Sequence, residues 1–405
     1  MLLSSVARLN MGQSPESSTY NETGEGLPFF QGKTDFGLRH PQARQYCVAP
    51  KKIAEKGDIL ISVRAPVGPV NIASETCCIG RGLGAIRAYG VDQFFLYFEL
   101  QYLQPTIEAL GSGAIFKAIN KNQLADVLVN RGGFDLEEQR QIARVLATVQ
   151  RAIEQQQAII TTTCELKRSL MHKLFTEGLR GEAQKPTEIG LVPESWDVVV
   201  LGRVARIGNG STPKRTTREY WEGGHLPWLT SGKIHEGNID SADEFVTELA
   251  AKECHLPMVP TGSVLVAITG QGKTLGNAAL VSFDTHISQH LAYISIAGNA
   301  LYSPFVFRYL QSRYEYLRSV GRAGGSTKAA LTCGFLKSVV IPKPDWDEQK
   351  EIADAFDILD DKLSLAERKR SHCADLFKTL LHQLMTAQVR VHNLDLDALG
   401  VPALD

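Results

Sequence analysis

Two stretches of the chain place apolar residues alternately four and three positions apart, over about 40 residues that contain neither proline nor glycine. This heptad spacing predicts a long helix with an apolar seam along one side. The predicted seam of the first stretch consists of Ile142, Leu146, Val149, Ile153 and Ile160. The predicted seam of the second stretch consists of Ile352, Phe356, Leu359, Leu363, Leu380 and Leu384.

Helices of this length cannot bury their seams inside a small domain. A helix of about 43 residues spans roughly 65 Å, so we expect the two seams to pack against each other. The chain has to return to its starting side between them, which favours an antiparallel pair. Asp135 and Asp347 are the predicted N-caps, with Glu138 and Glu348 in the first helical turns. Two unrelated helices in separate bundles are the alternative.

The segments that precede the two helices have a different pattern. They are rich in glycine and proline, and they carry short β-branched runs at residues 59–63, 198–201, 264–268 and 339–341. Such runs are typical of strands. We therefore expect a mixed α/β or β-rich domain before each long helix.

The chain also repeats itself. Residues 6–15 resemble 204–213, 57–63 resemble 262–268, 124–130 resemble 336–342, 138–143 resemble 348–353, and 169–174 resemble 379–384. The matches keep one order and drift in separation by only a few residues, as loop insertions would produce. Two copies of one unit, each a front domain followed by a long helix, are predicted.

Composition narrows the class of protein. The chain has 405 residues, which favours two or three domains. No apolar run approaches the length of a bilayer span, and no signal peptide is recognised at the start, so we expect a cytoplasmic protein. The 7 cysteines include no CxxC pair, which argues against a disulfide framework and a zinc site.

A net charge of -1 is an obstacle to nucleic-acid binding, because phosphate contacts usually leave a basic surplus. The charge is unevenly spread, since residues 345–405 carry 7 basic and 13 acidic side chains. The two front segments are slightly basic. DNA binding is therefore permitted, and we expect it to be weak for the chain alone.

The repeated motifs resemble the specificity subunits of type I restriction-modification systems. They are the segment 196–213 with Tyr220-Trp221 and 227–233, the strand-loops 57–68 and 262–272, the stretches 111–117 and 324–328, and two Glu-Gln-x-x-Ile-Ala helix starts. The resemblance covers essentially the whole chain. Each motif is weak by itself, but the full set in order, twice, is a specific signal.

The resemblance implies an α/β (α+β) chain with two target-recognition domains of mixed or β-rich structure, separated by two long helices that form an antiparallel coiled coil. The expected segments are recognition domain 1 at 1–134, a spacer helix at 135–181, recognition domain 2 at 182–344, a second spacer helix at 345–388 and a tail at 389–405. The resemblance further implies a non-catalytic subunit that reads a bipartite, asymmetric DNA site. Its partners would be two modification subunits, which methylate adenine, and restriction subunits. S-adenosylmethionine, ATP and magnesium would bind those partners, and no cofactor would bind this chain.

The first copy departs from the family pattern at its start. The second copy enters through residues 186–199, whereas the first copy begins almost at Val6, so its lead-in strand is missing. Either the start is shortened, or the tail at 389–395 supplies an equivalent segment.

Loops that combine glycine, a hydroxyl and a cation are the candidates for DNA contact, because phosphates need close backbone approach and base edges need polar side chains. In the first copy they are Gln13, Ser14, Gln31, Lys33, Arg64, Lys117 and Lys121. In the second copy they are Ser211, Thr212, Lys214, Arg215, Thr230, Ser231, Lys233, Thr269, Gln271, Lys273, Ser326, Thr327 and Lys328. Each of them is equally compatible with an ordinary surface turn.

Residues 267–274, which include Lys273, satisfy a relaxed phosphate-binding loop pattern. Such a loop must open a helix, but a β-like run follows here, so ATP binding is disfavoured. An ATP-binding enzyme built on this loop, and a coiled-coil scaffold without DNA specificity, remain the alternative functions.

Other catalytic patterns are equally incomplete. Asp345 with Glu348 and Lys350 imitates a nuclease set, but capping and ion-pair roles are favoured at a helix start. His286 and His290 have a metal-like separation in a segment that reads as extended, where the two rings do not converge. No tetrapeptide typical of amino-methyltransferases is present, so catalysis is expected on partner subunits.

Overall fold

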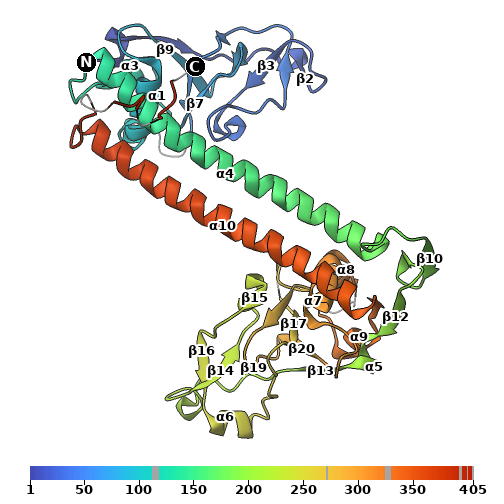
Figure 1. Cartoon of the computed structure of the whole chain (residues 1–405). Helices are drawn as coiled ribbons and strands as arrows, with labels where there is room; N and C mark the ends of the chain where they lie inside the picture. Colours follow the sequence, from blue (N-terminus) through green and yellow to red (C-terminus); the bar gives the residue numbers. More distant parts are fainter. Residues whose placement is uncertain (112–117, 271, 324–329, 392–394, 399, 404–405) are drawn as a thin grey trace. The chain divides into compact units, whose positions relative to one another are not determined.

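The computed structural model describes residues 1–405 apart from 112–117, 271, 324–329, 392–394, 399 and 404–405. The chain forms two compact units (Figure 1). Unit 1 comprises Met1–Ile159 and Leu365–Asp405, and unit 2 comprises Ile160–Ser364. Both long helices contribute to both units. The division of the sequence into separate domain and helix segments therefore stays a prediction.

Unit 1 is built on two sheets. The first has the strand order β1 (Ala7–Met11), β9 (Leu83–Ala88), β6 (Ile59–Ser62) and β7 (Val70–Ile72), all antiparallel. The second has the order β2 (Tyr20–Asn21), β4 (Tyr46–Cys47), β3 (Leu27–Phe30), β8 (Cys77–Ile79) and β5 (Ile53–Ala54), with β3 and β8 parallel. Its helices are α1 (Gln93–Tyr102), α2 (Gln104–Ala109) and α3 (Lys121–Ala125), with short 3-10 turns η1 (Leu3–Ser5), η2 (Ser17–Thr19) and η3 (Lys33–Asp35).

Unit 2 repeats this plan. Its main sheet has the order β13 (Ala205–Asn209), β20 (Leu291–Ile296), β17 (Val264–Ala267), β18 (Ala278–Val281) and β15 (Asn238–Ile239). A second sheet has the order β16 (Glu244–Val246), β14 (Leu226–Leu229) and β19 (His286–Ile287), with β14 and β19 parallel. Two pairs, β10 (Gln184–Thr187) with β11 (Gly190–Pro193) and β12 (Asp197–Val200) with β21 (Val340–Lys343), complete its strands. Its helices are α5 (Leu201–Val204), α6 (Glu248–Glu253), α7 (Ser303–Ser312), α8 (Tyr314–Ala323) and α9 (Cys333–Ser338), with 3-10 turns η4 (Arg218–Tyr220) and η5 (Lys233–Glu236).

Strand pairing makes the two copies comparable residue by residue. Met11 pairs with Gly84 as Asn209 pairs with Ala292. Phe30 pairs with Ile79 as Leu229 pairs with Ile287. The chain is thus an α+β protein with an internal duplication, in agreement with the fold class expected from the sequence.

The long helices are α4 (Leu136–Glu177) and α10 (Trp346–Met385). In unit 1 Arg390, just after α10, bonds Glu138, and Arg370 bonds Gln157. The residue number along the second helix therefore falls as the residue number along α4 rises. In unit 2 the same holds for Lys167 with Asp360 and Arg180 with Asp345. The two helices therefore run antiparallel within each unit.

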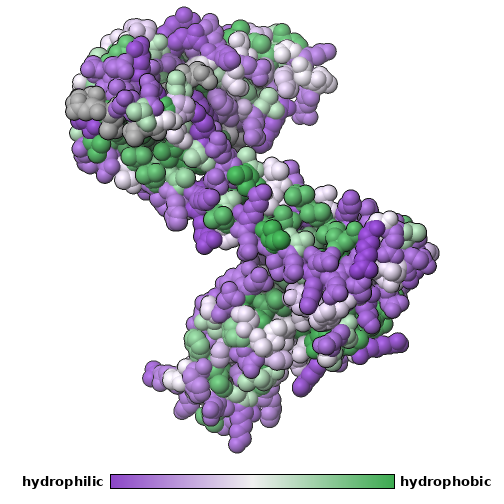
Figure 2. Space-filling view, in the orientation of Figure 1, coloured by the Kyte–Doolittle hydropathy of each residue, from purple (hydrophilic) through white to green (hydrophobic). Residues whose placement is uncertain are grey.

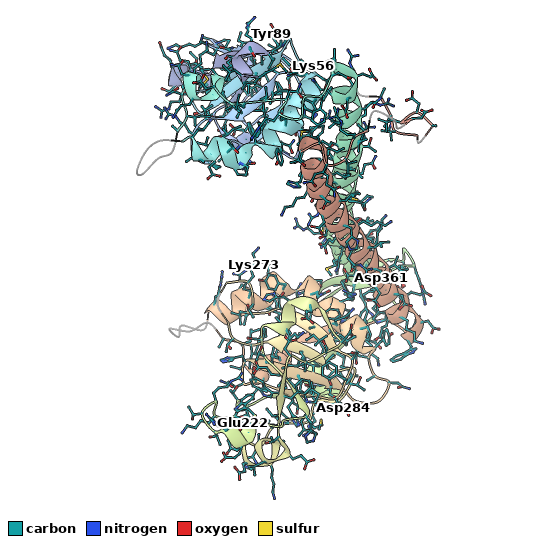
Figure 3. The ribbon with its side chains drawn as sticks, turned by 90° about the vertical axis from the view of Figure 1, so that its left-hand side faces the viewer. Lys56, Tyr89, Glu222, Lys273, Asp284 and Asp361 are labelled. Carbon is teal, nitrogen blue, oxygen red and sulfur yellow. The ribbon has the colours of Figure 1, made fainter. Side chains whose placement is uncertain are left out.

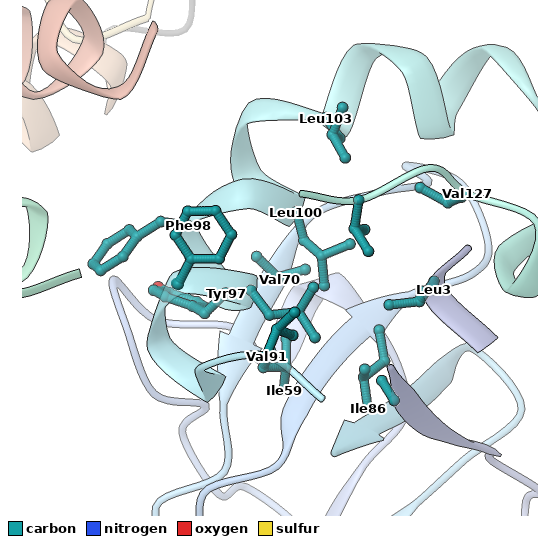
Figure 4. Close-up of a cluster of buried hydrophobic side chains, with 14 of the residues drawn as sticks. Leu3, Ile59, Val70, Ile86, Val91, Tyr97, Phe98, Leu100, Leu103 and Val127 are labelled. Atoms are coloured by element: carbon teal, nitrogen blue, oxygen red, sulfur yellow. The ribbon is translucent and has the colours of Figure 1, made fainter. Parts of the chain in front are cut away.

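The seam is most deeply buried near the ends of the helices. Ile142, Leu146 and Leu384 join the core of unit 1, and Ile352, Phe356 and Leu359 join the core of unit 2. Ile160 is also buried, whereas the remaining predicted seam residues are half-buried, namely Val149, Ile153, Leu363 and Leu380. The ends are deeper because α1 in unit 1 and α7 in unit 2 share these cores with the helix ends. Figure 4 shows Tyr97 and Phe98 of α1 in the core of unit 1.

The helix starts differ in one respect from the sequence prediction. Asp135 accepts a hydrogen bond from the Glu138 amide at 2.9 Å, as expected of an N-cap. At the start of α10 the equivalent bond, of 2.8 Å from the Glu348 amide, goes to Asp345 and not to Asp347. Asp347 already lies inside the first turn, because α10 begins at Trp346 directly after Asp345.

The lead-in of the first copy is short, and the tail packs nearby. Leu2 forms a single bridge with Leu128, where β12 and β21 form a full strand pair in the second copy. Val391 and Leu396 of the tail are buried, and Arg144 of α4 donates to the Val401 carbonyl. The tail thus lies against the beginning of α4. Whether the tail replaces the missing lead-in strand stays a prediction.

Candidate nucleic-acid interface

In unit 2, three loops meet where β13, β14 and β19 end. The Gly210 amide donates to the Leu291 carbonyl at 3.3 Å, and the Ser211 amide donates to the Ile287 carbonyl at 3.1 Å. The Ser288 amide donates to the Leu229 carbonyl at 2.9 Å. These bonds join three segments, namely the loop after β13, the loop after β14 and the turn between β19 and β20. We call the surface that they form the loop end.

The close approach of the first loop requires glycine. A Cβ on Gly210 would lie 1.8 Å from the Ile287 carbonyl oxygen, and a Cβ on the equivalent Gly12 would lie 2.2 Å from that of Gly80. Real atoms do not approach so closely, so a side chain would force the loops apart. This explains why both copies of the repeated motif contain glycine at this position.

Unit 1 has an equivalent loop end. The Gly12 amide donates to the Leu83 carbonyl at 2.9 Å, and the Gln13 amide donates to the Ile79 carbonyl at 3.0 Å. The Gly80 amide donates to the Phe30 carbonyl at 2.8 Å. The same scaffold is therefore built twice from different residues.

The loop end of unit 2 carries a chain of four hydrogen-bonded side chains. The Thr212 hydroxyl donates to Oε1 of Gln289, whose Nε2 donates to Nε2 of His290 at 3.3 Å. His290 Nδ1 is 2.6 Å from the hydroxyl of Thr269. Thr212 and Thr269, both predicted contacts, are thereby brought together, although 57 residues separate them in the sequence.

Ser211, Thr230 and Ser231 lie in the same loops and are half-buried. Ser211 contributes its backbone, since Trp228 Nε1 donates to its carbonyl at 3.2 Å. Thr230 likewise accepts from the Lys233 amide at 3.2 Å. These bonds order the loops on which the polar side chains stand.

Two predicted cations are already paired inside the chain. Arg215 forms an ion pair with Glu244, and its guanidinium lies 3.9 Å from the ring centroid of Trp221. Lys233 lies 2.8 Å from the Glu236 carboxylate and 3.0 Å from that of Asp243. Hydrogen bonds and charge from these two carboxylates raise the pKa of Lys233. The positive charge that the sequence offered at these positions is thus largely balanced internally.

Lys214 and Lys273 are exposed and have no ion pair among the described residues. Lys273 projects from unit 2, at the end away from Glu222 and Asp284 (Figure 3). Its backbone is fixed, because the Tyr314 hydroxyl donates to the Lys273 carbonyl at 2.8 Å and Asn277 Nδ2 donates at 2.7 Å. A turn and then β18 follow this loop, so it does not open a helix as a phosphate-binding loop requires.

In unit 1, Ser14 accepts a hydrogen bond from the Arg81 amide at 3.3 Å, and exposed Gln31 bonds Gln45 through its side chain at 3.3 Å. Arg64 is exposed and forms a bridge with Ala118. The remaining described candidates of this unit are also exposed, namely Gln13, Lys33 and Lys121. The candidates outside the described residues are Lys117, Gln271, Ser326, Thr327 and Lys328.

Sequence reasoning missed the turn between β8 and β9 in unit 1 and the equivalent turn between β19 and β20 in unit 2. Arg81 in unit 1 and Gln289 in unit 2 occupy equivalent positions, and both are exposed. The sequence pattern singled out His290 only as a candidate metal ligand, and not as part of this turn. The alignment of the two copies through their paired strands carries the signal, because it places both residues three positions before the small residue, Gly84 or Ala292, that pairs with the end of β1 or β13.

Two further observations bear on catalysis and on membranes. His286 is buried with its Nδ1 2.9 Å from the Pro257 carbonyl, and burial lowers its pKa. Within the described part of the chain, no group of three or more His, Cys, Asp or Glu side chains is arranged to hold a metal ion. No helix in that part is long and apolar enough to cross a membrane.

Comparison with known proteins gives one consistent result. The model of the type I restriction modification DNA specificity domain matches residues 1–162 and 193–372. A Methanocaldococcus jannaschii protein described as the MjaX specificity subunit of a type I restriction enzyme is 45% identical over 175 residues, covering 43% of this chain and 41% of that protein. The MjaIX specificity subunit of the same organism is 31% identical over 214 residues, covering 51% and 47%. The chain thus matches less than half the length of these two relatives.

A solved structure shows the same fold. The S subunit of a type I restriction-modification system from M. genitalium superposes with a TM-score of 0.65, over 95% of both chains, at 19% identity. The likeness concerns the fold alone.

Proposed function

Because the chain belongs to the family of type I restriction modification DNA specificity domains, we propose that it recognises a DNA sequence on behalf of a restriction-modification complex. It reads a bipartite site, one half with each loop end. It carries out neither methylation nor cleavage.

The observation that carries this proposal is the double construction of the loop end from unlike side chains. Equivalent positions hold Ser14 and Thr212, Arg81 and Gln289, Gly82 and His290, Arg64 and Thr269. The backbone bonds that join the loops are the same in both units. A shared scaffold with different polar groups is what reading two different half-sites requires. An asymmetric site follows from it.

The competing functions have less support. The loop that ends in Lys273 lacks the helix of an ATP site. A scaffold without DNA specificity leaves the duplicated, hydrogen-bonded loop ends without a role. Free cations such as Lys214 and Lys273 supply phosphate contacts, while the internal pairing of Arg215 and Lys233 keeps the affinity of the isolated chain low.

The partners are part of the proposal. Two modification subunits carry the methyl transfer to adenine and bind S-adenosylmethionine, and restriction subunits use ATP and magnesium. Apolar side chains reach the surface along the long helices (Figure 2) and offer area for packing against partner helices. Ile358 on α10 is one of the exposed apolar residues. Ile358 is 68% exposed, the largest exposed fraction among the large apolar side chains of the described residues.

The proposed function is tested by mapping methyladenine in a host that carries the modification subunits with and without this chain. We expect one bipartite, asymmetric motif that is methylated only when the chain is present. The purified chain alone should neither methylate nor cleave DNA, nor hydrolyse ATP. ATP hydrolysis by the chain that disappears in Lys273→Ala would reverse this conclusion in favour of an enzyme.

A second prediction concerns partner docking. Ile358→Glu should leave the chain folded, because the side chain is exposed, and should weaken association with the modification subunits about tenfold or more, as loss of an apolar anchor does. Co-purification and titration of the complex measure this effect. Ser364→Glu, at an exposed polar position of the same helix, is the matched control. Equal affinity of both variants would remove Ile358 from the interface.

A further inference from the structure

The turn between β8 and β9 in unit 1, and the equivalent turn between β19 and β20 in unit 2, each present one long polar side chain from the loop end. In unit 2 it is Gln289 and in unit 1 it is Arg81. Both are exposed, and neither has a charged partner among the described residues. The hydrogen-bonding state of these two side chains decides what they can bind.

The neighbours of Gln289 hold its amide at both ends. An amide oxygen cannot donate, so the hydroxyl of Thr212 must donate to Oε1 of Gln289. An amide nitrogen cannot accept, so Nε2 of His290 must accept the bond of 3.3 Å from Gln289. In this arrangement His290 carries its proton on Nδ1 and donates it to Thr269 at 2.6 Å.

This arrangement leaves one free N–H and one free lone pair on the Gln289 amide. Adenine offers the complementary groups side by side in the major groove, since N7 accepts and the N6 amino group donates. A glutamine whose amide is held in place by two neighbours loses less conformational entropy on forming that pair of bonds than a mobile one. The four side chains thus form a holder for a single adenine-reading amide.

The described residues of unit 1 form no such holder. Gly82 stands where unit 2 has His290, and a Cβ at this position would lie 2.1 Å from the Gln31 carbonyl oxygen. Arg64 stands in place of Thr269. Arg81 itself presents a planar guanidinium, whose two parallel N–H groups match the O6 and N7 acceptors of guanine.

We propose that Gln289 reads an adenine in the half-site recognised by unit 2, and that Arg81 reads a guanine in the half-site recognised by unit 1. This inference rests on the proposed function. To the proposed function the inference adds two residues that decide base identity, and it names the base that each residue selects. Thr212 and His290 act as positioning residues for Gln289.

The test uses the full chain in complex with its modification subunits and determines the bound motif by selection from random DNA duplexes. Gln289→Ala should lower the preference for adenine at one position of one half-site by about 5- to 150-fold, the value of a bidentate base contact. Arg81→Ala should relax a guanine in the other half-site by a similar factor. Gln155→Ala, an exposed glutamine on α4, is the matched control and should leave the motif unchanged.

Loss of a positioning residue and loss of a phosphate contact should each change the selected motif or the affinity in a different way. Thr212→Val keeps the shape of the side chain but removes the hydroxyl, so it should weaken the adenine preference at the Gln289 position and at no other. Lys273→Ala should lower the affinity for all sequences alike and reduce the dependence of binding on salt.

The outcomes separate this inference from the proposed function. A wild-type complex that selects no motif would refute sequence recognition itself. A wild-type motif that persists unchanged in Gln289→Ala and Arg81→Ala, or that only binds more weakly at every sequence, would overturn the base-reading roles and leave the proposed function intact.

Discussion

Replacing Asp357 and Asp360 together by alanine will lower the stability of unit 2 by about 3 kcal/mol. Arg308 on α7 is only 1% exposed, and it forms ion pairs with both carboxylates on α10. Lys167 on α4 shares Asp360. Without the two carboxylates, a buried guanidinium would keep only Gln311 as a hydrogen-bond partner among the described residues. We place the loss at the lower end of the range for broken buried pairs, because Asp357 is half exposed.

A unit of this size should respond with a fall in Tm of about 6–12 °C. Thermal unfolding of the full chain, followed by circular dichroism, measures the shift. A double variant that melts with the wild type would show that this cluster does not hold α7 to the helix pair.

The equivalent place in unit 1 suggests a control variant for this experiment. At the equivalent place, Phe98 packs against Phe377 with ring centroids 5.9 Å apart, and Gln150 Nε2 donates to the Tyr97 hydroxyl at 3.1 Å. An aromatic contact thus replaces the charged cluster. Buried ion pairs can be exchanged for apolar side chains at little cost. Adding Lys167→Phe and Arg308→Phe to the two alanines should therefore restore most of the lost stability, and a further decrease would show that unit 2 cannot accept the aromatic solution.

Exchanging the recognition domain of unit 2 for that of a relative will change one half of the methylated motif and leave the other half as it was. The two loop ends are built from separate segments, and each has its own core. The structure also indicates where to cut. Glu348 accepts hydrogen bonds from the Leu179 amide at 2.9 Å and from Trp196 Nε1 at 3.0 Å, and β12 pairs with β21.

Residues 201–339 should therefore be exchanged, so that the residues bonded to Glu348 and the pair of β12 with β21 remain native. The reciprocal exchange of residues 3–126 in unit 1 is the matched experiment and should change only the other half. Methylated-motif sequencing reports both. If either exchange altered both halves, the two loop ends would not read DNA independently.

Much of the architecture follows from local pattern. The heptad spacing and the absence of proline and glycine predicted both long helices, and the ordered repeats predicted two copies of one domain. These features depend on neighbouring residues, and a single sequence displays them. The resemblance to the specificity subunits rested on the same motifs, and the family match confirmed it.

The candidate site was less accessible, because the state of a side chain depends on residues far along the chain. In the sequence Arg215 and Lys233 are candidate free cations. In the fold Arg215 forms an ion pair with Glu244, and Lys233 forms one with Asp243. The cap at Asp345 in place of Asp347 was decided by where the first turn of α10 begins. Composition and spacing carry no information about such pairings.

The sequence by itself determined the duplication, the long helices and the family, since periodicity and repeated motifs are properties of the chain. Tertiary structure alone decided which polar groups face outward with their hydrogen bonds unfilled. The fold makes Gln289 a candidate base-reading residue. It brings Thr212 from another loop to one end of the Gln289 amide, and it places His290, which is hydrogen-bonded to Thr269, at the other end. The physical reason is that recognition depends on the donors and acceptors that folding leaves free, and these are known only after every internal partner has been placed.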